Sequence, residues 1–307
     1  MARMEETGGA WRQETISVSP VRYVLVHYHI FKNAGSTVEY ILAKAFGERF
    51  CGVHGPDTDS VLTGSELARF LEANPELEAV SSHHLKFPIP EIPRTVVIDC
   101  CFLRNPLDRV WSIYKYFNRI ETANELGVRA KQMDAKSFAE LLVRDYPQMV
   151  NDVQVNLLTN GGVYLRPPDQ ADFELAAHVV QRMSLLGIVE LFDESMTAAE
   201  YYLRPVFPVK LHYVRQNASD ANGDIRQLAG SKLYEQLAAL NQLDLQLVDR
   251  AREEVLRRFR LIPDGADRLG EFRRRCSEMR RQQLNYALAA KMTTCPPGSN
   301  TPISRMP

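Results

Sequence analysis

Apolar positions in this chain alternate between short continuous runs and longer stretches with helical spacing. The segment Tyr23–Thr37, YVLVHYHIFKNAGST, starts as an apolar strand and runs directly into a lysine, a glycine and two hydroxyl residues. The apolar residues that follow share one helical face: Val38, Ile41, Leu42 and Ala45. A strand–loop–helix unit is therefore predicted over about 21–47.

Further strands and helices alternate along the rest of the chain. Thr95–Leu103 is a nearly continuous apolar run, typical of a strand buried on both faces of a parallel sheet. Shorter strands are predicted at Leu185–Val189 and Val209–Val214. Helical patterns occupy residues 65–72, 106–117, 137–144, 172–183, the stretch after 192, 227–241 and 245–259. This alternation predicts an α/β fold of three layers, with a central, mostly parallel sheet flanked by helices.

The pattern also divides the chain into three parts. Residues 1–20 are polar and are predicted to form a flexible arm, while 21–262 form the main domain. Residues 263–307 are predicted to form an arginine-rich helix and a tail. The stretch Arg273–Arg281 is more typical of a solvated helical face than of a partner site.

Composition narrows the functional classes. The chain has 307 residues, 45% of them hydrophobic, and a formal net charge of −1, so it lacks the basic excess of a nucleic-acid-binding protein. It has no apolar signal-peptide core at its start and no run of about 18 apolar residues, so no membrane span is expected. The odd number of cysteines without CxxC spacing indicates reduced thiols and a cytoplasmic protein. The cysteines are Cys51, Cys100, Cys101, Cys276 and Cys295.

The loop after the first strand carries groups that bind anions. These are Lys32, Asn33, Ala34, Gly35, Ser36 and Thr37. Gly35 is expected to take a positive φ and to let the backbone approach a phosphate, while the Ser36 and Thr37 hydroxyls donate to it. Lys32 precedes the glycine, so the order differs from the GxxxxGKS/T loop of kinases and ATPases. The alternative is an ordinary turn in which Ser36 caps the helix.

A second anion site is predicted where the strand Thr95–Leu103 ends. Arg104 follows this strand, and its planar guanidinium suits a phosphate, while Ser112 lies about two helical turns beyond. The alternative pairs Arg104 with Asp108 or another carboxylate and leaves Ser112 solvated. Because ligands of parallel sheets bind beyond the carboxyl ends of the strands, both anion features are expected at one edge.

The sequence Ser82-His83-His84 supplies a candidate base. Histidine titrates near neutrality and can take a proton from an attacking hydroxyl. The alternatives are a loop histidine bonded to a carbonyl and a metal site, for which no third ligand stands at a telling spacing.

The order of these motifs, KxxGST, then Ser-His, then a strand ending in FLRNPLDRVWSIY, resembles the sulfotransferases that use 3′-phosphoadenosine 5′-phosphosulfate (PAPS). It is most similar to the branch with heparan sulfate 2-O- and other carbohydrate sulfotransferases and many bacterial relatives. The resemblance covers about residues 21–259. It includes the later segments Asn151–Gly162, Leu185–Ser195, Leu211–Ser219 and Leu240–Ala251.

This resemblance implies a P-loop-like fold and a nucleotide-binding transferase. The sulfuryl group of PAPS would pass in line to a hydroxyl of a carbohydrate or small molecule, leaving 3′-phosphoadenosine 5′-phosphate (PAP). Residues 32–37 would surround the 5′-phosphosulfate, with Lys32 also catalytic, and Arg104 and Ser112 would hold the 3′-phosphate. His83 would be the base and His84 is the competing assignment. No metal is required, and Arg215 and Asn217 are weaker candidates near the nucleotide.

Some positions depart from that family. Phe31 stands where many relatives have proline before the lysine, and the membrane anchor of Golgi relatives is absent, so a soluble bacterial type is expected. The acceptor is expected to contact residues 51–64, 115–135 and 145–168, whereas its identity and the oligomeric state stay open. The alternatives are a nucleotide or small-molecule kinase with an atypical phosphate loop, and an inactive nucleotide-binding relative.

Overall fold

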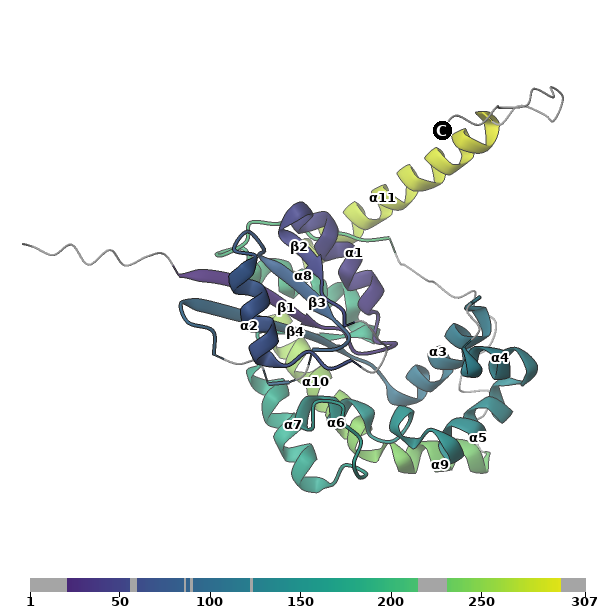
Figure 1. Ribbon diagram of the computed structural model, residues 1–307. Coiled ribbons are helices and arrows are strands. Elements are labelled where there is room, and N and C mark those ends of the chain that lie inside the picture. Colours follow the sequence, from purple (N-terminus) through teal and green to yellow (C-terminus); the bar gives the residue numbers. More distant parts are fainter. Residues whose placement is uncertain are drawn as a thin grey trace, which may run out of the picture.

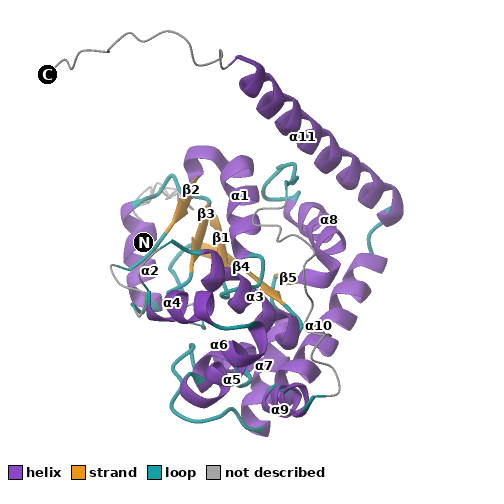
Figure 2. Cartoon of the chain, turned by 90° about the vertical axis from the view of Figure 1, so that its right-hand side faces the viewer, coloured by secondary structure: helices purple, strands orange, loops and turns teal. Residues whose placement is uncertain are grey.

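Five parallel strands form the centre of the molecule (Figures 1 and 2). The computed structural model describes residues 21–55, 60–85, 87–88, 91–121, 124–214 and 231–293, the last ten of these by their backbone alone. The strands are β1 (Arg22–Tyr28), β2 (Phe50–Gly52), β3 (Ala79–Ser82), β4 (Thr95–Leu103) and β5 (Leu185–Ile188). The predicted α/β class with a parallel sheet flanked by helices is confirmed.

The strand order is β2-β3-β1-β4-β5, so β1 lies between β3 and β4. The chain runs from β1 to the edge strand β2, returns through β3, and then crosses to the far side of β1. Tyr28 at the end of β1 pairs with Ser82 of β3 and with Cys101 of β4. The loops that follow these three strands therefore leave the same edge of the sheet, which is where open α/β sheets bind ligands.

Helices cover both faces of the sheet. The helices are α1 (Gly35–Phe46), α2 (Gly64–Ala73), α3 (Pro106–Arg119), α4 (Glu125–Gln132), α5 (Ala135–Asp145), α6 (Val153–Thr159), α7 (Gln170–Arg182), α8 (Phe192–Leu203), α9 (Lys232–Leu240), α10 (Gln242–Arg260) and α11 (Gly265–Thr293). Helices α1 and α8 pack on one face, and α2, α6, α7 and α10 pack on the other. Val24 and Val26 of β1 point to the second group, and Leu25 points to the first, so β1 is buried on both sides.

A separate helical lobe of α3, α4, α5 and α9 has its own apolar core around Phe138 (Figure 1). Helix α3 starts directly after β4, so this lobe stands at the carboxyl edge of the sheet. The Arg109 Nε atom donates to the Phe31 carbonyl oxygen at 3.0 Å, and the Phe31 ring meets Tyr116 edge-on with centroids 5.2 Å apart. These contacts fix the lobe to the loop that follows β1.

The beginning of α11 is an internal interface. Phe272 is buried in the core beside α8, and Arg273 donates to Asp193 and Glu194 of that helix. The prediction that Arg273–Arg281 is only a solvated face is therefore wrong for its first residues. Contacts with α1 continue along the helix, because the Tyr40 hydroxyl lies 3.5 Å from Met279 Sδ and 3.3 Å from Gln283 Nε2, and the end of α11 extends away from the sheet (Figure 1).

The strand predicted at Val209–Val214 is wrong, because these residues lie in an irregular segment. The Leu211 N–H donates to Glu200 of α8, and Tyr213 packs on Phe192 at 4.8 Å between centroids. The apolar residues of this segment thus cover α8 instead of pairing with the sheet. Strands β2 and β3 were not predicted, because they have only three and four residues and β3 ends in two serines.

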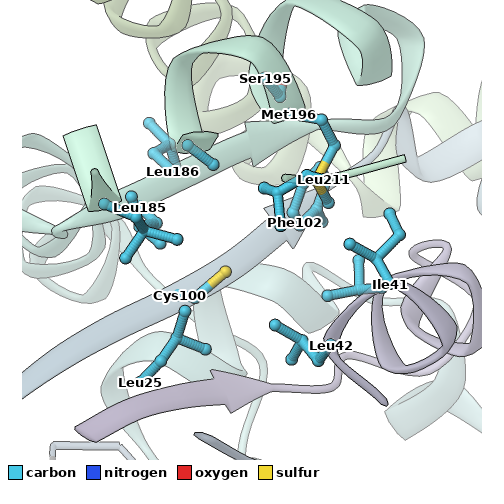
Figure 3. A pocket seen from close by; sticks show the side chains of 13 residues that line it. Leu25, Ile41, Leu42, Cys100, Phe102, Leu185, Leu186, Ser195, Met196 and Leu211 are labelled. Carbon is cyan, nitrogen blue, oxygen red and sulfur yellow. The ribbon is translucent and has the colours of Figure 1, made fainter. Parts of the chain in front are cut away.

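A cavity of about 20 Å³ lies between α1, the sheet and α8 (Figure 3). Apolar side chains line it, including Leu25, Ile41, Phe102 and Met196. It is large enough for one water molecule, but an apolar cavity offers water too few partners. None of the predicted site residues lines this cavity, so it is a packing void in the core and not the candidate site.

Gly187 of β5 gives a test of this packing. A Cβ atom at Gly187 would lie 2.2 Å from Cε1 of Phe102, which itself packs on Phe192. We expect Gly187→Ala to lower the free energy of unfolding by about 1–3 kcal/mol in chemical denaturation. Gly270→Ala in α11 is the control, because nothing lies within 4 Å of its Cβ position. If Gly187→Ala is as stable as the wild type, the expectation is wrong, and the Phe102 ring must instead move into the cavity that it lines.

Candidate active site

The loop after β1 is wound by two residues in the left-handed region. Lys32 has φ 67° and Ala34 has φ 61°, and Ala34 is the N-cap of α1 without a side-chain cap bond. The carbonyl oxygen of Ala34 accepts from the Thr37 N–H at 2.9 Å. The first N–H groups of a helix have no partner in the preceding turn, so this end of α1 presents donors to an anion. The alternative in which Ser36 caps the helix is wrong, and Ser36 lies exposed in the first turn.

Gly35 serves a different purpose from the expected one. The positive φ angles fall on Lys32 and Ala34, so the prediction that Gly35 takes a positive φ is wrong. Its missing side chain instead makes room for His29, because a Cβ atom at Gly35 would lie 1.8 Å from Cδ2 of His29. The ring of His29 therefore lies directly against the start of α1.

Lys32 and Arg104 lie together at the ends of β1 and β4. The Arg104 Nη1 atom donates to the Lys32 carbonyl oxygen at 2.9 Å, and the Lys32 Nζ atom lies 4.4 Å from the centre of the Tyr116 ring. Burial, and then the charges of Arg104, Arg119 and Arg109, lower the pKa of Lys32 to about 8. An anion bound here would relieve this excess of positive charge. Sequence reasoning missed Arg119 and Arg109.

The positions of Ser112 and Thr37 support the predicted anion site less directly than those of Lys32 and Arg104. Ser112 lies at the end of the second turn of α3 and is partly buried, and Thr37 is buried in the first turn of α1. The structure thus brings Lys32 and Arg104 into contact, while Ser112 remains a prediction from the resemblance. Arg215 and Asn217 lie outside the described residues.

A fully buried glutamine of α6 joins the two anion elements. Gln154 Oε1 accepts from the Arg104 N–H at 2.9 Å and from Asn33 Nδ2 at 2.8 Å, and Gln154 Nε2 donates to the Arg104 carbonyl oxygen at 2.8 Å. Asn33 Nδ2 also donates to the carbonyl oxygen of Phe102. The side-chain nitrogen of Asn33 is therefore used to brace the loop against β4.

Two buried carboxylates support this glutamine. Asp244 of α10 accepts from the N–H groups of Gln154 and Val155, and the Asp244 N–H donates to Asp152 Oδ1 at 2.8 Å. Burial, and then the charge of Asp244, raise the pKa of Asp152 to about 7. Sequence reasoning missed this network, since its members lie about 90 residues apart along the chain.

The two candidate bases both bond through Nδ1, and they differ in whether the other ring nitrogen, Nε2, carries the proton. His83 Nδ1 lies 2.9 Å from the His29 carbonyl oxygen, and a carbonyl only accepts, so Nδ1 carries the proton and the neutral ring has an unprotonated Nε2. His84 Nδ1 lies 2.8 Å from the Gly55 N–H and must accept, so its neutral ring carries the proton on Nε2. His83 can therefore take a proton at Nε2, whereas His84 offers a donor there.

The environment of His83 keeps it neutral. Burial, and then the charge of His29, lower the pKa of His83 to about 4. Its ring lies against that of His29 with centroids 3.4 Å apart, while the residue as a whole is exposed to solvent. The bond to a carbonyl, which the alternative proposed for a loop histidine, is present and fixes the ring orientation.

A chain of hydrogen bonds continues behind His83. His29 Nδ1 lies 2.8 Å from Glu39 Oε1, which also accepts from the Ser81 hydroxyl at 2.9 Å, and His27 Nδ1 lies 2.8 Å from that hydroxyl oxygen. Burial acts to raise the pKa of Glu39, but the hydrogen bond and charge of His29, together with Ser81, lower it to about 2. Sequence reasoning missed this group, although histidines at alternate positions of an apolar strand were a visible signal.

Comparison with known proteins adds little to this geometry. The chain is 27% identical over 242 residues to an uncharacterized protein of Archaeoglobus fulgidus, in an alignment that covers 75% of this chain and 96% of that protein. No family model matches the chain.

Within the described part of the chain, no three or more His, Cys, Asp or Glu side chains are grouped so as to hold a metal ion. No helix in that part combines the length and apolar character needed to cross a membrane. Cys51, Cys100, Cys101 and Cys276 are free thiols, and Cys295 lies outside the described residues.

The raised pKa of Asp152 predicts a pH dependence of stability. Between the ordinary value of 3.8 and about 7, the folded state holds a proton that the unfolded state has released. Stability from this group is therefore present at low pH, falls as pH rises through that window, and is level above it. Asp152→Asn keeps an acceptor for the Asp244 N–H and suits φ 41°.

Urea unfolding at pH 5 and pH 8 checks this expectation. Asp152→Asn should lose less stability between the two pH values than the wild type does. Asp249→Asn, at an exposed position of α10, controls for the loss of one negative charge. Equal losses in all three proteins would contradict the assignment.

Proposed function

We propose that this protein is a cytoplasmic sulfotransferase that uses PAPS to sulfate a hydroxyl of a carbohydrate or small molecule. The observation that carries the proposal is that three elements meet at one sheet edge. The anion loop with Lys32 follows β1, Arg104 follows β4, and His83 follows β3, and these strands are neighbours. A donor with two anionic groups and an acceptor hydroxyl need such an arrangement.

The chemistry assigns a separate task to each element. Bound PAPS supplies an activated sulfuryl group and a phosphate leaving group. His83 Nε2 accepts the proton of the acceptor hydroxyl while the acceptor oxygen forms its bond to sulfur. Lys32 and the N–H groups at the start of α1 stabilise the charge on the phosphate oxygen as its bond to sulfur breaks. The products are the sulfate ester and PAP, and no metal ion is required.

The residues of the anion loop contribute unequally to this proposal. The N–H groups of Gly35 and Ser36, with the two hydroxyls of Ser36 and Thr37, would surround the 5′-phosphosulfate, whereas the Thr37 N–H is bonded to the Ala34 carbonyl oxygen. Lys32 rests on Tyr116 through a cation–π contact worth about 0.5–2 kcal/mol, which a doubly charged ligand can outcompete. Asn33 and Ala34 would act mainly by shaping the loop.

The two alternatives receive less support. A kinase needs a carboxylate for its metal ion near the end of β4, but Asp99 lies within that strand and accepts from the Ser184 N–H at 2.7 Å. An inactive nucleotide-binding relative would not need the unprotonated His83 Nε2 that the bond to His29 produces.

Binding of PAP tests the cofactor. PAP should raise the melting temperature several degrees more than ADP at the same concentration, because only PAP carries the 3′-phosphate assigned to Arg104 and Ser112. A ligand at 100 times its Kd stabilises the folded state by about 2.7 kcal/mol. Ser112→Ala should narrow the difference between PAP and ADP, and Ser65→Ala on the distant helix α2 should not. Equal shifts of the melting temperature with PAP and ADP would contradict the assignment of Arg104 and Ser112 to the 3′-phosphate.

Replacement of the two histidines tests the base. His83→Ala should lower transfer at least about 100-fold and leave the Kd for PAP unchanged, because it removes the proton acceptor. His84→Ala should have a much smaller effect. Transfer is followed from sulfur-labelled PAPS to a panel of carbohydrate and small-molecule acceptors, a screen that also identifies the acceptor. If His84→Ala alone abolishes transfer, the base is His84.

A further inference from the structure

His29 is a buried side chain that the mechanism above does not use. It follows β1 and is only 7% exposed, and its ring lies between the first residue of α1 and the ring of His83. The ring therefore occupies the junction between the end of α1 that offers donors to an anion and the candidate base.

The two nitrogens of this ring have different surroundings. Nδ1 is paired with Glu39 Oε1 at 2.8 Å. Among the described residues, the side-chain hydrogen bond of His29 is made through Nδ1 and none is made through Nε2, and the ideal Cβ position of Gly35 lies only 2.0 Å from Nε2. Nε2 therefore stands beside the first turn of α1, where the helix has N–H groups without carbonyl partners.

We propose that His29 Nε2 donates a hydrogen bond to the sulfuryl group during its transfer, with Glu39 holding the ring in place. This inference rests on the proposed function, because it places a further donor between the leaving phosphate at α1 and the acceptor oxygen at His83. A donor in this position would contact the sulfuryl group itself, which passes from the phosphate oxygen to the acceptor oxygen.

Charge supports this role. Glu39 is ionised, because its bonds to His29 and Ser81 lower its pKa to about 2. A carboxylate only accepts, so His29 Nδ1 gives its hydrogen to Glu39, and Nε2 can donate only from the imidazolium form of the ring. The proposal places this cation between the Glu39 carboxylate and the anionic sulfuryl group, both of which would stabilise it. Such a charge would favour an anion at the start of α1. Glu39 is thus a positioning residue, and Ser81 of β3 fixes its carboxylate in turn.

A purely structural role is the competing explanation. The pair His29–Glu39 joins β1 to α1, and a buried pair of this kind also braces a fold. The two roles differ in what they predict for two ligands that differ only in the sulfuryl group.

Calorimetric titration with PAP and PAPS, without acceptor, separates them. His29→Asn keeps an amide in the place of Nδ1 for Glu39 but has no donor at Nε2. We expect it to weaken PAPS binding by about tenfold or more, the size of a hydrogen bond to a charged group, and PAP binding by less than about twofold. His29→Gln reaches toward the Nε2 position and should restore part of the loss. Glu39→Gln should also weaken PAPS more than PAP.

The outcomes distinguish this inference from the proposed function. Equal weakening of both ligands in His29→Asn, or no weakening of either, overturns the donor role. If the wild type binds neither PAP nor PAPS, the proposed function fails, and titration with inorganic sulfate decides the donor role alone. A sulfate-dependent change of the His29 Nε2 signal in nitrogen NMR supports donation, and an unchanged signal overturns it.

Discussion

The hydrogen bonds of Gln154 are the contact on which the site most depends. Its amide donates to the Arg104 carbonyl and accepts from the Arg104 N–H, as a neighbouring strand would, and it also accepts from Asn33. A side chain from α6 thus continues the pairing of the sheet beyond the point where β1 and β4 end. The Lys32 loop and Arg104 are therefore held at a fixed separation without a ligand, which limits the cost of ordering on binding.

This arrangement places unfavourable features at one edge of the sheet. Lys32, Ala34 and Asp152 have positive φ angles, each costing about 1–3 kcal/mol, and Asp152 lies beside a second buried carboxylate. Such strain and desolvation persist only where the surrounding structure enforces them. Here the two apolar cores on either side of the sheet supply the stability, while the edge carries charged and strained groups that suit ligand binding.

The sequence predicts those parts of the fold that leave a local pattern. The strand Thr95–Leu103 and the unit around Lys32 were placed correctly, because a continuous apolar run followed by a polar turn identifies a buried strand. Strand β3 was missed because half of it is serine. Arg104 was within reach of this reasoning because it follows a predicted strand, whereas His83 was singled out as a histidine that titrates near neutrality and by the resemblance. Gln154 was not within reach, because its partners Arg104 and Asn33 are 50 and 121 residues away.

Gly35 illustrates how one missing side chain links distant choices in the sequence. Its Cα lies so close to His29 that any larger residue at position 35 would displace the imidazole, and the contacts of that ring with Glu39 and His83 would be lost with it. Positions 29 and 35 therefore cannot vary independently. In homologous chains, a histidine at the first position should coexist with glycine at the second, and a larger residue at the second should accompany a smaller one at the first. Homologues with histidine at position 29 and glycine at position 35 would be those that keep the same arrangement of the site.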